Sequence, residues 1–282
     1  MTVERVGAGW LALREPADAR ARARGLVDEL RRHLPATGRM VIHDLGCGTG
    51  AMGRWLAPLL PGPQRWVLHD RDADLLAAAT ADPPGPAADG SAVTLETQQS
   101  DINELGSGEL GNATLITASA LLDMLTADEL SGLVDLCMVA ACPALWTLSV
   151  VGRVELAPAD ALDRHVAAAF NAHQRRATGR GVLLGPDAPE VARKELSRRG
   201  AEVVVRASPW RLGASDADLT AEWLGGWLWA ACEQEPELST QTGSYKRRRV
   251  AEATAGQLEV TVDHADLLIL PPSAGSICAA TR

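Results

Sequence analysis

Lysine, tyrosine and phenylalanine are scarce in this sequence of 282 residues, and long apolar runs are missing. Its lysines are Lys194 and Lys246, so arginine supplies nearly all the positive charge, and the formal net charge is -9. An acidic surface repels a phosphate backbone, which disfavours a nucleic-acid substrate. The longest apolar run, 138–151, contains Pro143 and is shorter than the ~20 residues that a membrane-spanning helix needs. We therefore expect no membrane role.

Paired cysteines are also lacking. No C-x-x-C pair and no histidines at metal-ligand spacing accompany the five cysteines, which are Cys47, Cys137, Cys142, Cys232 and Cys278. Residues 1–9 lack the apolar segment of an export signal. We therefore expect reduced thiols, no metal centre and a cytoplasmic location. The chain is long enough to bury a sizeable core without disulfides or metal.

Short apolar runs alternate with helical patterns along the first half of the chain. An amphipathic helix over 15–34 leads in, and strands are then predicted at 40–45, 66–69, 93–97, 114–118 and 145–151, with helices at 51 onward, 74–80 and 128–138. Such alternation is typical of a parallel sheet with helices on both faces. Further on we expect an inserted helix at 158–177, then a helix at 189–199, a strand at 201–206, a Trp-rich helix at 216–232 and a last strand at 258–262.

The sequence Asp44-Leu45-Gly46-Cys47-Gly48-Thr49-Gly50 directly follows an apolar strand. Glycines let the backbone approach a ligand closely, and the helix that follows offers free N–H groups at its N-terminus. The stretch also satisfies a dinucleotide fingerprint, because 48–53 reads G-x-G-x-x-G and Asp70 lies at about the ~20-residue spacing of a ribose ligand. A carboxylate at Asp44 would repel a pyrophosphate, whereas it suits a cationic ligand.

This pattern of an acidic residue, one apolar position and G-x-G-x-G resembles motif I of class I S-adenosylmethionine-dependent methyltransferases. The resemblance implies a Rossmann-like, seven-stranded, mostly parallel α/β sheet with helices on both faces and an antiparallel last strand. It also implies a cofactor site whose members are Asp44, Gly46, Cys47, Gly48, Gly50, Asp70, Arg71, Asp101, Ile102 and Ser119. There Asp70 matches the position that holds the ribose hydroxyls, Asp101 the position that accepts from the adenine amino group, and Ile102 would pack on the ring.

The resemblance further implies one methyltransferase domain over 1–282. Residues 1–37 would form an N-terminal helical lid, 38–151 the cofactor-binding half, and 152–282 the acceptor-side half with its helical insertion. The end of the fourth strand, 117–123, lacks the Asn/Asp-Pro-Pro-Tyr/Phe sequence of enzymes that methylate exocyclic amino groups of DNA bases or glutamine. This absence counts against nucleic-acid N-methylation.

Acceptor-side candidates lie after the fourth strand and on the inserted helix. Asp123 would face the acceptor or simply cap a helix. His173 falls on the apolar side of its helix and is either a buried structural histidine or a general base, a role that histidine often fills in enzymes. Candidate substrate-binding residues are Asn171, Gln174, Trp210 and Arg14. The basic run 246–249 is expected to form a solvated helix face.

These observations predict transfer of a methyl group from S-adenosylmethionine to an O, N or C nucleophile of a small molecule, with S-adenosylhomocysteine as product. The region that includes 185–186 and 208–212 looks similar to a group of bacterial methyltransferases of unassigned acceptor. We expect a role in specialised metabolism. Three alternatives stay open: an RNA methyltransferase, a non-catalytic S-adenosylmethionine-binding protein and a nicotinamide oxidoreductase.

Overall fold

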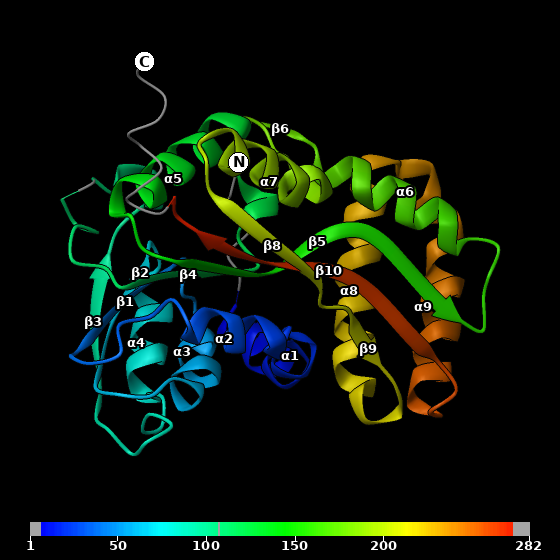
Figure 1. Cartoon of the computed structure of the whole chain (residues 1–282). Coiled ribbons are helices and arrows are strands. Elements are labelled where there is room, and N and C mark those ends of the chain that lie inside the picture. Colours follow the sequence, from blue (N-terminus) through cyan, green and yellow to red (C-terminus); the bar gives the residue numbers. More distant parts are fainter. Residues whose placement is uncertain (1–6, 107, 273–282) are drawn as a thin grey trace.

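The computed structural model describes residues 7–106 and 108–272, and within them the main sheet has eight strands (Figure 1). Their bounds are β1 Met40–Leu45, β2 Gln64–Asp70, β3 Val93–Gln99, β4 Leu115–Ser119, β5 Ala144–Ala157, β8 Glu202–Ala207, β9 Trp210–Leu212 and β10 Glu259–Leu270. The strand order is β3-β2-β1-β4-β5-β10-β8, and β9 pairs with β10. A short hairpin, β6 Ala177–Thr178 and β7 Gly181–Val182, stands apart from this sheet.

Strands β1 to β5 run parallel, and β10 is antiparallel to β5, β8 and β9. The predicted mostly parallel sheet and its antiparallel last strand are therefore confirmed. The predicted count of seven strands is wrong, because residues 210–212 form β9 instead of a loop. Three residues are too few to show a periodic signal, and β9 exists because it pairs with 260–262 of β10.

Helices cover both faces of the sheet. Their bounds are α1 Ala8–Ala21, α2 Arg24–Arg31, α3 Ala51–Leu56, α4 Ala73–Ala81, α5 Ala127–Ala140, α6 Asp163–Gln174, α7 Ala188–Arg198, α8 Ala217–Gln234 and α9 Ser239–Thr254. Figure 1 shows α5 and α7 on one face, and α2, α3 and α4 on the other. In the part of the chain that the structure describes, no helix combines the length and apolarity that crossing a bilayer requires.

The N-terminal lead-in is two helices and not the one predicted over 15–34. Helix α1 ends at Ala21 and α2 begins at Arg24. The break is fixed from outside the segment, because the backbone N–H of Ala23 donates to Asp266 Oδ2 at 2.8 Å. A bond to a residue more than 240 positions away carries no local sequence signal, so the periodicity of the segment could not predict the break.

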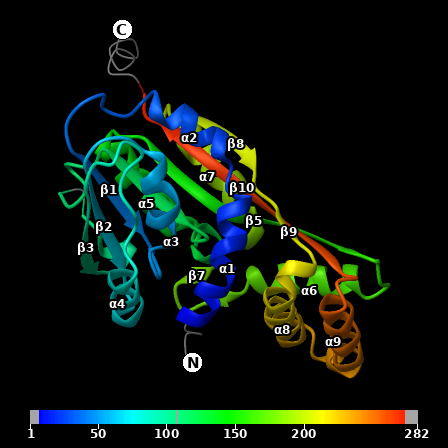
Figure 2. The same ribbon diagram turned by 90° about the horizontal axis from the view of Figure 1, so that it is seen from below.

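Strands β5 and β10 are much longer than expected and continue past the main sheet as an antiparallel pair (Figure 1). Helices α6, α8 and α9 lie beside this extension (Figure 2). A separate apolar core lies here, and it includes Leu156, Val166, Trp227 and Val260. The inserted helix, predicted over 158–177, is shorter because residues 158–162 form a loop that leads into α6.

The basic run 246–249 is not uniformly solvated, in contrast to the expectation. Arg249 on α9 is buried, and its Nη2 donates to both carboxylate oxygens of Asp163 on α6 at 2.8 Å. Tyr245 donates to the same carboxylate at 2.5 Å. This network ties α9 to α6 within the second core, so the positive charge of Arg249 serves packing and not solvation.

Two histidines, His43 on β1 and His69 on β2, are buried side by side inside the sheet. His43 Nδ1 and His69 Nε2 lie 2.9 Å apart and share a hydrogen bond, with the rings stacked. Burial disfavours the charged imidazolium, and it lowers the pKa of His69 to about 4 and that of His43 below its usual range. Both rings are therefore neutral in the folded protein near pH 7.

We predict that this pair makes the fold sensitive to acid. Between pH 6.5 and 4 the unfolded chain protonates His69 and the folded chain does not, so stability falls as the pH falls. Urea unfolding at pH 7.5 and 5.0 measures how much unfolding free energy wild type and His69→Gln each lose between the two pH values. We expect wild type to lose about 2 kcal/mol more than the variant. The exposed His33→Gln should keep the wild-type pH dependence. Equal pH dependence in His69→Gln would contradict the prediction.

Candidate functional site

The glycine-rich turn connects β1 to α3 at the edge where the parallel strands end. Gly46, Gly48 and Gly50 all have positive φ, at 63°, 55° and 81°, which favours glycine at each. A Cβ at Gly48 would lie 3.0 Å from Leu11 Cδ1 of α1, so the N-terminal helix packs directly over the turn. The Cys47 side chain within the turn is buried, which raises the pKa of its thiol and keeps it neutral.

Asp70, at the end of β2, holds the turn in place. Its Oδ2 accepts from the Gly48 N–H at 2.8 Å, and its Oδ1 accepts from the Asp72 N–H at 2.9 Å. The structure thus brings Asp70 and the glycine turn together, while the Arg71 side chain next to it is exposed to solvent. Each carboxylate oxygen can accept a further hydrogen bond, so Asp70 retains the capacity to bind hydroxyl groups.

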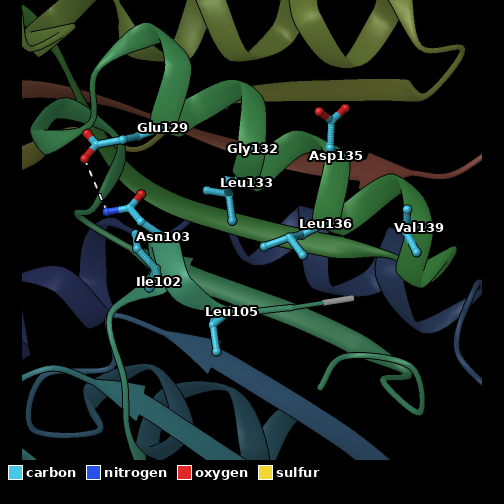
Figure 3. A pocket seen from close by; sticks show the side chains of 9 residues that line it. All are labelled: Ile102, Asn103, Leu105, Glu129, Gly132, Leu133, Asp135, Leu136 and Val139. Carbon is cyan, nitrogen blue, oxygen red and sulfur yellow. Dashed lines mark hydrogen bonds between the residues drawn. The ribbon is translucent and has the colours of Figure 1, made fainter. Parts of the chain in front are cut away.

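Asp101 follows β3 beside Asp70, because the Ser100 N–H donates to the Asp70 carbonyl at 3.0 Å. Its Oδ1 accepts from the backbone and side-chain amides of Asn103, at 3.0 and 2.9 Å. Ile102 is half-buried and lines a groove of about 380 Å³ against α5 (Figure 3). This groove also includes Leu105, Glu129 and Val139. Asp101 therefore lies at the strand ends with Asp70, whereas Ile102 faces α5.

Asp44 is the most deeply buried acid of the turn, with 1% of its surface exposed. Its Oδ1 accepts from Thr117 Oγ1 at 2.7 Å, but its Oδ2 has no hydrogen-bond partner among the described residues. Burial raises the pKa of Asp44 to about 7, against the opposing effects of Thr117 and of the positive charge of Arg22. A buried carboxylate oxygen without a partner is costly, which marks Asp44 as a group prepared to bind a cation or a donor.

Arg22, at the break between α1 and α2, reaches into the same region and was missed by sequence analysis. Its Nη2 donates to Ser119 Oγ at 3.1 Å, its Nε donates to Thr147 Oγ1 at 3.4 Å, and its guanidinium stacks on Trp55 at 5.2 Å. The sequence shows it as one of several arginines on a polar helix face, so no local signal separates it from them. It lies beside Ser119, a predicted cofactor residue at the end of β4.

The acceptor-side candidates Asp123 and Gln174 lie close together. Asp123 is in the turn that follows β4, and Gln174 is the last residue of α6. Gln174 Nε2 donates to Asp123 Oδ2 at 3.5 Å. Burial raises the pKa of Asp123 to about 6, opposed in part by the charges of Arg14 and Arg176. Asn171 is used elsewhere, since its Nδ2 donates to the Gly152 carbonyl at 2.7 Å. Within residues 7–106 and 108–272, no group of three or more His, Cys, Asp or Glu side chains is placed to hold a metal ion.

His173 is buried between α6 and α8, with both ring nitrogens engaged. Its Nε2 lies 2.8 Å from Glu233 Oε2, and its Nδ1 lies 3.4 Å from Arg176 Nη1. The ring also packs edge-on against Trp229. An arginine can only donate, so the neutral tautomer that fits both contacts accepts at Nδ1 and donates from Nε2 to Glu233. In this arrangement neither nitrogen is available to take a proton from another molecule.

Arg14 and Trp210 form a stacked cluster between α1 and β9. The Arg14 guanidinium lies 5.0 Å from the Trp210 ring and 5.9 Å from the Trp10 ring. Asp18 joins both partners, because it accepts from Arg14 Nε and from Trp210 Nε1 at 2.9 Å. Trp210 is thus buried in a packed cluster instead of forming the wall of an open pocket. The cluster fixes α1 against the β10 side of the sheet.

We predict that Asp44→Asn gains stability relative to wild type as the pH rises. Asp44 keeps its proton up to about pH 7 in the fold, whereas an unfolded aspartate loses it near 4, so raising the pH through this range favours unfolding of wild type. Between pH 5 and 8 the difference in unfolding free energy should shift by about 3 kcal/mol in favour of the variant. The exposed Asp28→Asn serves as control. A shift for Asp44→Asn that is no larger than the shift for Asp28→Asn would refute the prediction.

No family model matches the chain, and no curated protein matches it. Similar solved structures include the cyclopropane synthase MmaA2 from Mycobacterium tuberculosis, at 14% identity over 87% of this chain and 83% of that one, with a TM-score of 0.43. The YcgJ protein from Bacillus subtilis is similar at 11% identity over 89% and 100% of the two chains, with a TM-score of 0.46. The magnesium protoporphyrin IX methyltransferase from Synechocystis PCC 6803 is similar at 16% identity over 74% and 84%, with a TM-score of 0.41.

Proposed function

We propose that this chain is an S-adenosylmethionine-dependent methyltransferase, folded as one domain, whose acceptor is a small molecule. The observation that carries the proposal is the buried Asp44 carboxylate beside a turn of three positive-φ glycines, whose Oδ2 has no hydrogen-bond partner in the described part of the chain. A pyrophosphate at this turn would meet a buried acid of the same charge. A ligand with a cationic amino group and no phosphate satisfies the orphaned oxygen, which favours S-adenosylmethionine over a nicotinamide dinucleotide.

The other residues at the strand ends suit the same ligand. Asp70 would hold the ribose hydroxyls with its remaining acceptor capacity, and Asp101 would accept from the adenine amino group. The glycines leave room for the backbone to approach the ligand, and Leu11 on α1 closes the turn from above. Bound there, S-adenosylmethionine supplies an electrophilic methyl group. The chain's contribution is to exclude water around that group and to align an acceptor with it.

For an acceptor that must lose a proton, we propose Asp123 as the general base. Its raised pKa of about 6 keeps it ionised yet basic near neutral pH. It lies after β4, close to Ser119, and Gln174 orients one of its oxygens. His173, the candidate predicted from sequence, is held by Glu233 and Arg176, so it would need to release one of them first. For a carbon nucleophile or a neutral amine, positioning alone would suffice.

We predict that the protein binds S-adenosylhomocysteine in isothermal titration calorimetry and does not bind NADH. Asp70→Ala should weaken this binding by roughly 1.5–3 kcal/mol, because it removes hydrogen bonds to a charged acceptor. Asp28→Ala, an exposed change on α2, should leave the affinity as it is. Tight binding of NADH without binding of S-adenosylhomocysteine would refute the proposed function, and an unchanged affinity in Asp70→Ala would remove Asp70 from the ribose role.

We further predict how the rate depends on pH once an acceptor that loses a proton has been found by screening small molecules with methyl-labelled cofactor. With Asp123 as base, kcat rises with pH through about 6 and then levels off, because only the ionised form accepts a proton. Asp123→Asn should lower kcat by about 10²-fold or more, and its kcat should no longer rise with pH through about 6. His173→Gln should keep this rise of kcat with pH. The reverse outcome, with this rise lost only in His173→Gln, would assign the base to His173.

A further inference from the structure

We propose that Arg22 binds the carboxylate of the cofactor's amino-acid end, so that Arg22 and Asp44 together recognise the zwitterion and join cofactor binding to the N-terminal helices. The inference rests on the proposed function and extends it to a residue that sequence analysis did not single out. It starts from the incomplete bonding of Arg22, which is 3% exposed yet whose Nη1 has no hydrogen-bond partner among the described residues.

The charge of Arg22 is not neutralised by a direct partner. None of the ion pairs within 4 Å found in the described part of the chain involves it, and its hydrogen bonds go to the neutral hydroxyls of Ser119 and Thr147. Burial lowers the pKa of Arg22 from its ordinary value, but an arginine in a protein stays protonated. A buried cation without a counter-ion is unfavourable, so the position is suited to an anion that arrives from outside.

The carboxylates around Arg22 are bonded to other groups. Asp18 accepts from Arg14 and Trp210. Asp266 accepts from the N–H groups of Leu148 and Ala23 and from Ser208 Oγ. Both influence the pKa of Arg22 through space, but turning either towards Arg22 would break bonds that hold β9 or the α1–α2 break. Neither is therefore available as a resident counter-ion.

Asp44 is the third carboxylate near Arg22, and the two charges complement each other without touching. Each acts on the pKa of the other, yet they form no ion pair within 4 Å. Asp44 Oδ2 and Arg22 Nη1 both lack hydrogen-bond partners within residues 7–106 and 108–272. Both are placed where neighbouring strands end. Asp44, next to last in β1, lies beside Thr117 of β4, and Arg22 bonds to Ser119, the last residue of β4, which pairs with Thr147 of β5. A ligand that carries an ammonium and a carboxylate on one carbon would satisfy both orphaned atoms.

The place of Arg22 in the chain gives this contact a second consequence. Arg22 directly precedes Ala23, whose N–H is held by Asp266, so its backbone is fixed where α1 ends. Upstream, Leu11 of α1 covers Gly48, and Glu15 accepts from Arg54 Nε of α3 at 2.7 Å. An anion on Arg22 would therefore add a bond between the cofactor and the segment that covers it. Loss of that bond should affect ligands with the carboxylate and spare ligands without it.

The test compares two ligands that differ in the amino-acid end. Calorimetric titrations of the full chain use S-adenosylhomocysteine and 5′-methylthioadenosine, which keeps the nucleoside and the sulfur but has no carboxylate or ammonium. We expect Arg22→Gln to lower the affinity for S-adenosylhomocysteine by about tenfold or more, as for lost hydrogen bonds to a charged group, with 5′-methylthioadenosine affected by less than about twofold. The control is Arg24→Gln, an exposed arginine on α2 that should change neither affinity.

Equal losses for both ligands in Arg22→Gln would show that Arg22 only supports the structure, and no loss for either would show that it binds nothing; each result overturns the inference. Should Arg22→Gln fail to fold, Arg22→Lys replaces it. We then expect a smaller loss of affinity, still confined to S-adenosylhomocysteine, because lysine keeps the charge but lacks the paired N–H donors of the guanidinium. In wild type, binding of 5′-methylthioadenosine as tight as that of S-adenosylhomocysteine would overturn the inference and leave the proposed nucleoside site standing. Binding of neither ligand would overturn the proposed function itself.

Discussion

Burial of an acid and a base, Asp44 and Arg22, near the carboxyl ends of β1 and β4 is the constraint on which the N-terminal half of this structure depends. Strand order reverses between β1 and β4, and crevices in open α/β sheets form at such a point. Asp44 and Arg22 are both buried there, and neither is fully bonded. The surrounding segments exclude water from these two groups. Among them are α1, which covers the turn through Leu11, and α2, whose Leu26, Val27 and Leu30 pack in the core on the sheet.

Asp266 holds the break between α1 and α2 in place. Its carboxylate is buried in β10, and it accepts from the Leu148 N–H of β5, from Ser208 before β9 and from the Ala23 N–H. Burial raises the pKa of Asp266, and these bonds and the charge of Arg22 oppose the rise. One side chain thus bonds to Leu148, whose φ is positive, to Ser208 just before β9, and to Ala23 at the break between α1 and α2. Removing it would release three segments that are distant in sequence, so it acts as a structural centre beside the proposed cofactor site.

Features that depend on local sequence could be predicted, whereas features that depend on distant residues could not. Strands such as β1 and β2, and helices such as α5, follow from local periodicity and caps, and these were predicted within a few residues. The turn at Gly46, Gly48 and Gly50 was predicted because it is a contiguous motif. The α1–α2 break, β9 and the position of Arg22 depend on bonds to residues at least 48 positions away. No window along the chain contains both partners, so periodicity could not reveal them.

Residues 152–282 show a different reason for the limits of sequence reasoning. His173 lies on the apolar side of α6, as its spacing indicates, but the element it faces is α8 with Glu233, and spacing alone does not name a neighbour. Gln174, one position on, points instead to Asp123. Helix α1 meets both halves: Leu11 and Glu15 contact the turn and α3, while Arg14 stacks on Trp210 of β9. Because Arg14 also lowers the pKa of Asp123 through its charge, displacement of α1 would alter the electrostatics of the proposed base and uncover the glycine turn together.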